Sequence, residues 1–155
     1  MNVLVIDFPA TKVAVLSHIG SPENVLDTAN KFIAWRKETG LSPIATSKTF
    51  GIPYSDPNNT PEGQFRWDIC GSINEDIPAN DRGVFNSEIP AGKCAVVRRY
   101  GNEDLGEAIY YLYQQWLPQS GYKARQHPCY FEYVTLSHQV DNENDLITDV
   151  HIPIE

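Results

Sequence analysis

The most distinctive chemical group in this sequence is one carboxylate, Glu132, inside a run of aromatic residues. The run Cys129–Val134 reads Cys-Tyr-Phe-Glu-Tyr-Val, which is typical of a strand with a covered face. An ionised carboxylate on a covered face is costly unless a cation compensates it. Aromatic rings beside a carboxylate attract a lipophilic cation. The structural alternative is that Glu132 points into solvent or pairs with Arg98 or Arg99.

Further aromatic residues occur in segments that could line a site together with Glu132. Trp35 and Trp116 lie on the apolar stripes of helical segments, so we assign them to a helix–sheet core. Tyr110 and Tyr111 lie off such a stripe and are better candidates for a cleft. The expected ligand-binding residues are Glu132, Trp67, Tyr110, Tyr111, Tyr130, Phe50, Gly51 and Tyr54.

Other kinds of chemistry find little support in the residue spacing. The four histidines lack the spacing of zinc ligands, so we predict no metal and no cofactor. His127 and Cys129 could form a nucleophile pair, but no phosphate-binding loop or nucleophile-elbow motif occurs. We therefore expect no catalytic residues. If the protein is an enzyme, Glu132 would act as a base with Tyr110 or Tyr111.

The chain also contains an internal repeat that has to position these residues. A shift of 81 residues aligns the two halves without a gap and places Trp35 on Trp116. The same shift places Asp68 on Asp149. It also places Gly51 on Glu132, so that one half would carry a carboxylate where the other has no side chain. We interpret the repeat as two similar units around a pseudo-twofold axis, with a ligand groove between them.

Each half has the pattern strand, strand, helix, strand, strand. The expected strands are 2–8, 11–19, 46–53, 64–73, 84–89, 93–99, 128–136 and 146–153. Ser21 should cap the first helix, which ends at Gly40, and Asn102 should cap the second. Pro118 and Gly121 should end the second helix.

This pattern predicts an α+β fold of duplicated strand–helix–strand–strand units. Its antiparallel sheets would pack two helices on one side, and a central ligand groove would follow the axis. We expect one domain over residues 1–155, with repeat units at approximately 2–74 and 83–155.

Composition limits the classes of partner. The net charge of −8 and the absence of a basic stripe argue against direct binding of nucleic acid. No apolar run approaches the length of a membrane span, and the N-terminus lacks a signal peptide, so we expect no membrane association. Three cysteines without CxxC spacing suit reduced thiols in a cytoplasmic protein.

Several segments resemble the GyrI-like, or AraC-type, effector-binding domain family. They are Lys93–Val97, Gln115–Leu117 followed by Gly121-Tyr122, Phe65–Asp68 and, above all, Pro128–Tyr133. The family includes the C-terminal multidrug-binding modules of Rob-type and BmrR-type regulators. The resemblance implies a ligand in the central groove, where a buried glutamate corresponding to Glu132 meets cationic aromatic compounds. It also implies a stand-alone module, because the repeat fills residues 2–155 and leaves no room for a DNA-binding arm.

The leading hypothesis is a stand-alone binding protein for lipophilic cationic or aromatic small molecules. The first alternative is a DNA gyrase inhibitor, because Glu88–Val96 is similar to the corresponding region of that branch. The second is a groove hydrolase that uses the same glutamate. If the protein has a macromolecular partner, we expect a regulator protein or DNA gyrase. A homodimer is also compatible with the sequence.

Overall fold

A computed structural model describes residues 1–56, 59–136 and 141–155, without the side chains of Glu62 and Glu143. The chain divides into two compact units. Unit 1 combines Met1–Pro9 with Pro90–Glu155, and unit 2 is Ala10–Ile89. The first strand of the chain therefore belongs to the same unit as the second half of the sequence.

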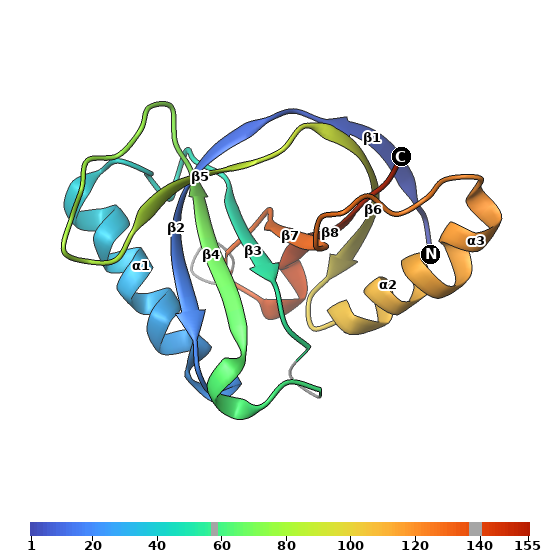
Figure 1. Ribbon diagram of the computed structural model, residues 1–155, viewed down its shortest axis with the longest axis horizontal. Coiled ribbons are helices and arrows are strands. Elements are labelled where there is room, and N and C mark those ends of the chain that lie inside the picture. The colour runs from blue at the N-terminus through green and yellow to red at the C-terminus, as the bar shows by residue number, and fades with distance from the viewer. Residues whose placement is uncertain (57–58, 137–140) are drawn as a thin grey trace. The chain divides into compact units, whose positions relative to one another are not determined.

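Unit 2 contributes four antiparallel strands, with one helix packed on one face of them (Figure 1). The strands follow the order β3 (Thr49–Pro53), β4 (Arg66–Ser72), β2 (Thr11–Ile19) and β5 (Phe85–Ile89). The helix α1 (Val25–Thr39) packs against β2 and β4.

The α1 helix has the boundaries that its flanking residues predict. Ser21 accepts a hydrogen bond from the Glu23 amide, and a 3-10 turn at Pro22–Asn24 leads into the helix. Gly40 ends the helix in the left-handed conformation, with a φ of 68°. The apolar face of α1 packs into a core that includes Phe32, Trp35 and the strand residue Ile69.

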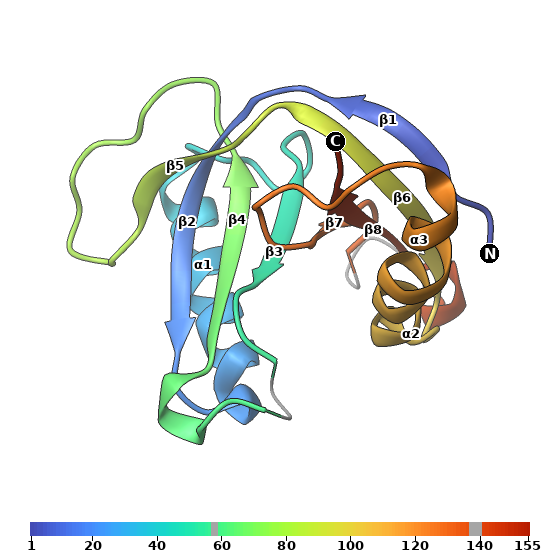
Figure 2. The same ribbon diagram turned by 45° about the vertical axis from the view of Figure 1, so that its right-hand side comes forward.

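Unit 1 repeats the arrangement with a second set of strands. Their order is β1 (Leu4–Phe8), β6 (Gly92–Tyr100), β8 (Ile147–Pro153) and β7 (Tyr130–Tyr133). The helix α2 (Leu105–Tyr111) packs against β6 and β8, and a π-helical turn joins it to α3 (Leu117–Ser120) (Figure 2). The prediction of an α+β fold with antiparallel sheets and helices is therefore confirmed.

Two details of the second helix differ from the prediction. Asp104, not Asn102, caps α2, because its side chain accepts a hydrogen bond from the Gly106 amide at 2.9 Å. Pro118 does not end the helix but lies in α3, which ends before Gly121. Proline lacks an amide hydrogen and crowds the preceding turn, so the wider π-helical turn before it has a physical reason.

Each unit contains an edge strand that comes from the other half of the sequence. β1 pairs with β6, and β5 pairs with β2. The 81-residue shift preserves this register: it carries the pair Leu4 and Val96 onto Phe85 and Val15.

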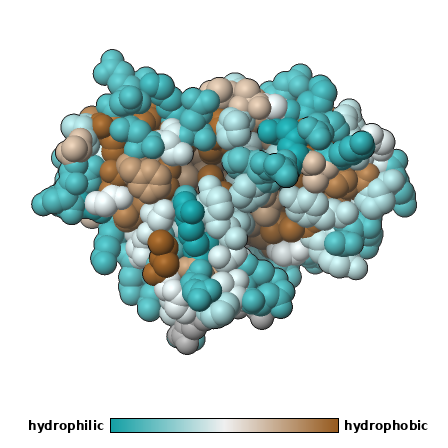
Figure 3. All heavy atoms as spheres, in the orientation of Figure 1, coloured by the Kyte–Doolittle hydropathy of each residue, from teal (hydrophilic) through white to brown (hydrophobic). Residues whose placement is uncertain are grey.

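Polar side chains cover much of the surface seen in Figure 3, in keeping with the net charge of −8. Among the described residues, no helix is long and apolar enough to cross a membrane. A search of the same residues finds no group of three or more His, Cys, Asp or Glu that could hold a metal ion.

Candidate functional site

The two faces of the unit 1 sheet can be assigned from Arg99. Its Nη1 and Nη2 atoms lie 3.7 Å from the carboxylates of Glu103 and Glu107, respectively, and Glu107 belongs to α2. Arg99 therefore faces the helix. Because successive strand residues point to opposite faces, the neighbouring Arg98 lies on the face away from α2.

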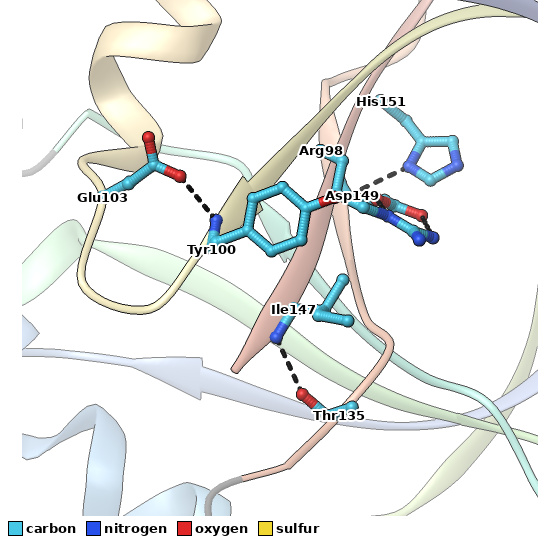
Figure 4. A network of polar contacts seen from close by, with 7 residues as sticks. All are labelled: Arg98, Tyr100, Glu103, Thr135, Ile147, Asp149 and His151. Atoms are coloured by element: carbon cyan, nitrogen blue, oxygen red, sulfur yellow. Dashed lines mark hydrogen bonds and ion pairs between the residues drawn. The ribbon is translucent and has the colours of Figure 1, made fainter. Parts of the chain in front are cut away.

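Arg98 holds Asp149 through two parallel hydrogen bonds on that face. Its Nε donates to Oδ1 of Asp149 at 2.8 Å, and its Nη2 donates to Oδ2 at 2.9 Å (Figure 4). The Asp149 side chain is only 14% exposed, whereas that of Arg98 is 47% exposed. The hydrogen bonds to Asp149 raise the pKa of the Arg98 guanidinium, and the charge of Glu132 raises it further.

Glu132 lies directly across from Asp149. Arg98 on β6, Asp149 on β8 and Glu132 on β7 are consecutive partners in the strand register, so they share one face. We call these three residues the unit 1 trio. Glu132 is half-buried. The trio holds two carboxylates and one guanidinium, which gives it a formal charge of −1 (+1 − 1 − 1) when all three are ionised.

Aromatic groups pack beside the trio on the same face. Tyr130 lies two residues before Glu132, and its ring stacks on His151 with centroids 4.8 Å apart. Phe8 meets the Tyr130 ring edge-on at 5.3 Å. The Tyr130 hydroxyl lies 3.3 Å from the Cys94 sulfur. Burial first, and then the Cys94 contact, raises the Tyr130 pKa, so this ring stays neutral and forms an apolar layer.

Backbone contacts hold the strands around Asp149 in place. The His151 Nδ1 donates to the Asp149 carbonyl at 3.1 Å, and the Ile147 amide donates to the Thr135 hydroxyl at 2.7 Å (Figure 4). At the end of β6, the Tyr100 amide donates to Glu103 at 2.8 Å. These bonds restrict the strand ends on either side of the trio.

Two of the predicted ligand residues lie on the helix side of unit 1. Tyr110 and Tyr111 belong to α2, which covers the Arg99 face, and Tyr110 is 62% exposed. Within unit 1, the structure therefore brings Tyr130, but not Tyr110 or Tyr111, to the face that carries Glu132.

The other four predicted residues belong to unit 2 and divide between its two faces. Trp67 packs against the α1 core, and Gly51, opposite Ile69, shares that face. Phe50 is fully buried on the face away from α1. The half-exposed Tyr54 lies under the Arg66 guanidinium, 4.2 Å from its ring centroid.

Unit 2 holds a counterpart of the trio with a different charge. Asp68 corresponds to Asp149 and accepts two hydrogen bonds from Arg66, at 3.2 and 3.0 Å. Ser17 donates to the same carboxylate at 2.5 Å. The residue opposite Asp68 on β3 is Ile52. We call Arg66, Ser17, Asp68 and Ile52 the unit 2 cluster; Arg66 and Asp68 balance to a net charge of zero.

The expected pairing of Gly51 with Glu132 is wrong by one residue. Asp68 on β4 lies opposite Ile52 on β3, and Asp149 on β8 lies opposite Glu132 on β7. An ungapped shift cannot detect this offset, because strand pairing sets the register of β3 and β7. The residue opposite the aspartate is therefore isoleucine in unit 2 and glutamate in unit 1.

The sequence reasoning named Arg98 only as an alternative partner of Glu132, and Asp149 only as a repeat position. The available signal was the aspartate at matching positions, since the 81-residue shift places Asp68 on Asp149. A matched aspartate in two strands indicates a shared structural role. The partner of each aspartate, however, comes from a different strand in each unit.

The thiols are poorly suited to nucleophilic chemistry. Burial raises the pKa of Cys129 to about 11 and also raises that of Cys94. His127, proposed above as a base for Cys129, instead donates its Nδ1 proton to the Pro128 carbonyl at 2.8 Å. A protonated thiol is a weak nucleophile, so the unit 1 trio is the stronger candidate for function.

The fold and the trio give a domain with a candidate anionic site on one face of the unit 1 strands, and comparison with known proteins identifies the class. The GyrI-like small molecule binding domain matches residues 1–155, so the chain belongs to this family. The chain is 45% identical to the probable transcriptional regulator YgiV of Escherichia coli K12, over 99% of this chain and 96% of that protein. It is 26% identical to a DNA gyrase inhibitor of Erwinia billingiae, over 99% of this chain and 97% of that protein.

Solved structures show the same fold at low sequence identity. The C-terminal domain of EcmrR superposes with a TM-score of 0.79 at 16% identity, covering 99% of this chain and 97% of that domain. The chain spans 57% of the EcmrR chain solved in a complex with DNA. SAV2435 bound to tetraphenylphosphonium superposes with a TM-score of 0.62 at 9% identity, covering all of this chain and 94% of that one.

Proposed function

We propose that this small-molecule-binding domain takes lipophilic monocations and that Glu132 supplies the counter-charge. The observation that carries the proposal is the pairing of Glu132 with Asp149 across from a single arginine. Two like charges directly opposite each other in a sheet repel. A ligand with one positive charge relieves that repulsion and balances the trio.

The surroundings of the trio favour an aromatic cation over a small hydrated ion. Tyr130, His151 and Phe8 form a buried aromatic layer on the same face, which lowers the polarity of the surroundings of the trio. The structural neighbour SAV2435 was solved with tetraphenylphosphonium, a cation of this kind. Tetraphenylphosphonium is therefore the probe of choice.

Calorimetric titration of tetraphenylphosphonium into the Glu132→Gln variant tests the proposal. We expect the affinity to fall at least ~10-fold, or about 1.4 kcal/mol, because the trio becomes neutral. Glu107→Gln is the matched control, since it removes one glutamate charge from the α2 side of the same unit. Its affinity should stay within about 2-fold of the wild-type value, a change of under half a kcal/mol. Equal affinities for wild type and Glu132→Gln would refute the role of Glu132.

Inhibition of DNA gyrase is the second candidate function. Its support is the similarity to the Erwinia billingiae gyrase inhibitor along nearly the whole chain. A supercoiling assay with purified gyrase would test it, and inhibition at micromolar protein is the expected result. Full gyrase activity at that concentration would rule out this candidate without affecting the cation-binding proposal.

A further inference from the structure

We propose that the outer edge of strand β1 is an interaction surface at which two copies of this chain pair, β1 against β1 in antiparallel orientation. The inference concerns an edge of unit 1 and does not depend on the cation binding proposed above. The expected product is a weak homodimer, whose population depends on the protein concentration.

The backbone of β1 is paired on one side. β1 lies at the end of the strand order, and among the described residues β6 is the strand that pairs with it (Figure 2). Backbone N–H and C=O groups of a strand point to both of its sides, so about half of those in Leu4–Asp7 face away from β6. Within the described part of the chain, no residue outside β6 forms a backbone hydrogen bond to Leu4–Asp7. An open strand edge of this kind is a template for another strand.

The side chains along this edge are apolar and exposed to solvent. Leu4 is 66% exposed, Val5 is 40% exposed and Ile6 is partly exposed. Asp7 is the charged residue of β1, and its carboxylate forms an ion pair with Lys93 on β6 at 3.0 Å. Edge strands that avoid pairing carry uncompensated charges, prolines or a covering segment. The first three residues of β1 carry neither a charge nor a proline.

The edge strand of unit 2 is protected in this way. β5 is polar where β1 is apolar, because the 81-residue shift places Val5 on Asn86 and Ile6 on Ser87. The Asn86 side chain donates to the Ile77 carbonyl at 3.0 Å and accepts from the Ile77 amide at 2.8 Å. These two bonds resemble those that a residue of a neighbouring strand exchanges. The segment before β5 is therefore tied to this strand, whereas the valine side chain of β1 cannot form such bonds.

The charges along β1 favour a second copy of this chain as the partner. The net charge of −8 makes two copies repel each other in general. The β1 edge is an exception, because the charge of Asp7 is balanced by Lys93. Antiparallel pairing of a strand with its own copy has twofold symmetry, so both copies use the same surface. With Val5 on the axis, Leu4 lies opposite Ile6 and no two charged residues of β1 lie opposite each other.

The contact is small, so the dimer should be weak. Two short strands bury less than the roughly 1,000 Å² that a stable interface needs. We therefore expect a monomer at about 1 µM protein and a large dimer fraction at about 500 µM. Added salt should strengthen the association, because it screens the repulsion between two acidic copies. A contact held by ion pairs would instead weaken with salt, and that result would overturn the inference.

Charges introduced at Val5 test the pairing, with sedimentation equilibrium of the full chain as the measurement. In Val5→Lys and in Val5→Glu, like charges would face each other across the axis, so each variant should associate at least ~10-fold more weakly than wild type. An equimolar mixture of the two variants brings opposite charges together and should associate within about 3-fold of wild type. Leu26→Lys and Leu26→Glu are the matched controls, because Leu26 is 70% exposed and belongs to α1 of unit 2. Both controls should associate like wild type.

The mixture separates self-pairing from other roles of this edge. Loss of association in both Val5 variants without recovery in their mixture would show that Val5 does not face its own copy, and this would overturn the inference. Wild type that stays monomeric at about 500 µM would also overturn it, as would Val5 variants that associate like wild type. Circular dichroism should show every variant folded. Hydrogen exchange at Leu4–Asp7 should slow with rising concentration in wild type but not in Val5→Lys, and equal behaviour of the two proteins would contradict the proposal.

Discussion

The unit 1 trio and the unit 2 cluster each contain an aspartate paired with an arginine, but the two aspartates have different neighbours. Asp68 is 3% exposed and bound by both Arg66 and Ser17, opposite the apolar Ile52. Among the described residues, Arg98 is the side chain that binds the Asp149 carboxylate, and Asp149 lies opposite Glu132. A balanced ion pair beside an apolar residue stabilises a sheet. An added carboxylate gives up some of that stability and, under the proposed function, supplies the counter-charge for a cation.

Introducing a carboxylate into unit 2 should have the largest effect on stability. Ile52 is 5% exposed, so the glutamate in Ile52→Glu would be desolvated next to Asp68. We expect the free energy of unfolding to fall by about 3 kcal/mol or more, measured by urea denaturation. Ile52→Met is the size-matched apolar control. A loss below about 1 kcal/mol for Ile52→Glu would show that the unit 2 cluster tolerates the charge as unit 1 does.

Neutralising the unit 2 aspartate should cost less. Asp68→Asn removes a charged acceptor from Arg66 and Ser17, and the Arg66 side chain is 41% exposed, which reduces the penalty. We expect a loss of about 2 kcal/mol in unfolding free energy. The same substitution at Asp149 should cost about half as much, since Glu132 remains as a partner for Arg98. A larger loss at Asp149 than at Asp68 would reverse the assignment of structural and functional roles.

Converting unit 1 to the unit 2 pattern should have the smallest effect on stability. Glu132→Ile removes the like-charge pair and adds a β-branched residue, so we expect a gain of about 0.5 kcal/mol. The gain should shrink in 1 M salt, where charge repulsion is screened. Urea denaturation at two salt concentrations measures it. A loss of more than about 1 kcal/mol would show that Glu132 stabilises the fold, as a structural residue would.

The local signals in the sequence predicted much of the fold. Ser21 and Gly40 mark the start and the end of the first helical region, as predicted. They could be predicted because a helix cap and a glycine in the left-handed conformation depend on neighbouring residues alone. Pro118 shows the limit of that reasoning, since a π-helical turn lets the second helix continue through it.

The site was less predictable, because it depends on which strand lies beside which. Glu132 stood out through its aromatic neighbours, but its partner Asp149 is set by strand register. A slip of one residue in that register exchanges the two faces of a strand, which is why Gly51 was matched to Glu132 in place of Ile52. The choice of Arg98 over Arg99 likewise depends on the face that α2 covers.

The most direct test of the account uses two probes of nearly equal size and opposite charge, tetraphenylphosphonium and tetraphenylborate. The quantity measured is the ratio of their affinities for the wild-type protein and for Glu132→Gln. We predict that wild type favours the cation by at least about 100-fold and that the variant lowers this ratio at least about 10-fold, because one negative charge attracts one probe and repels the other. A ratio that is the same in both proteins would contradict the claim that Glu132 supplies the counter-charge.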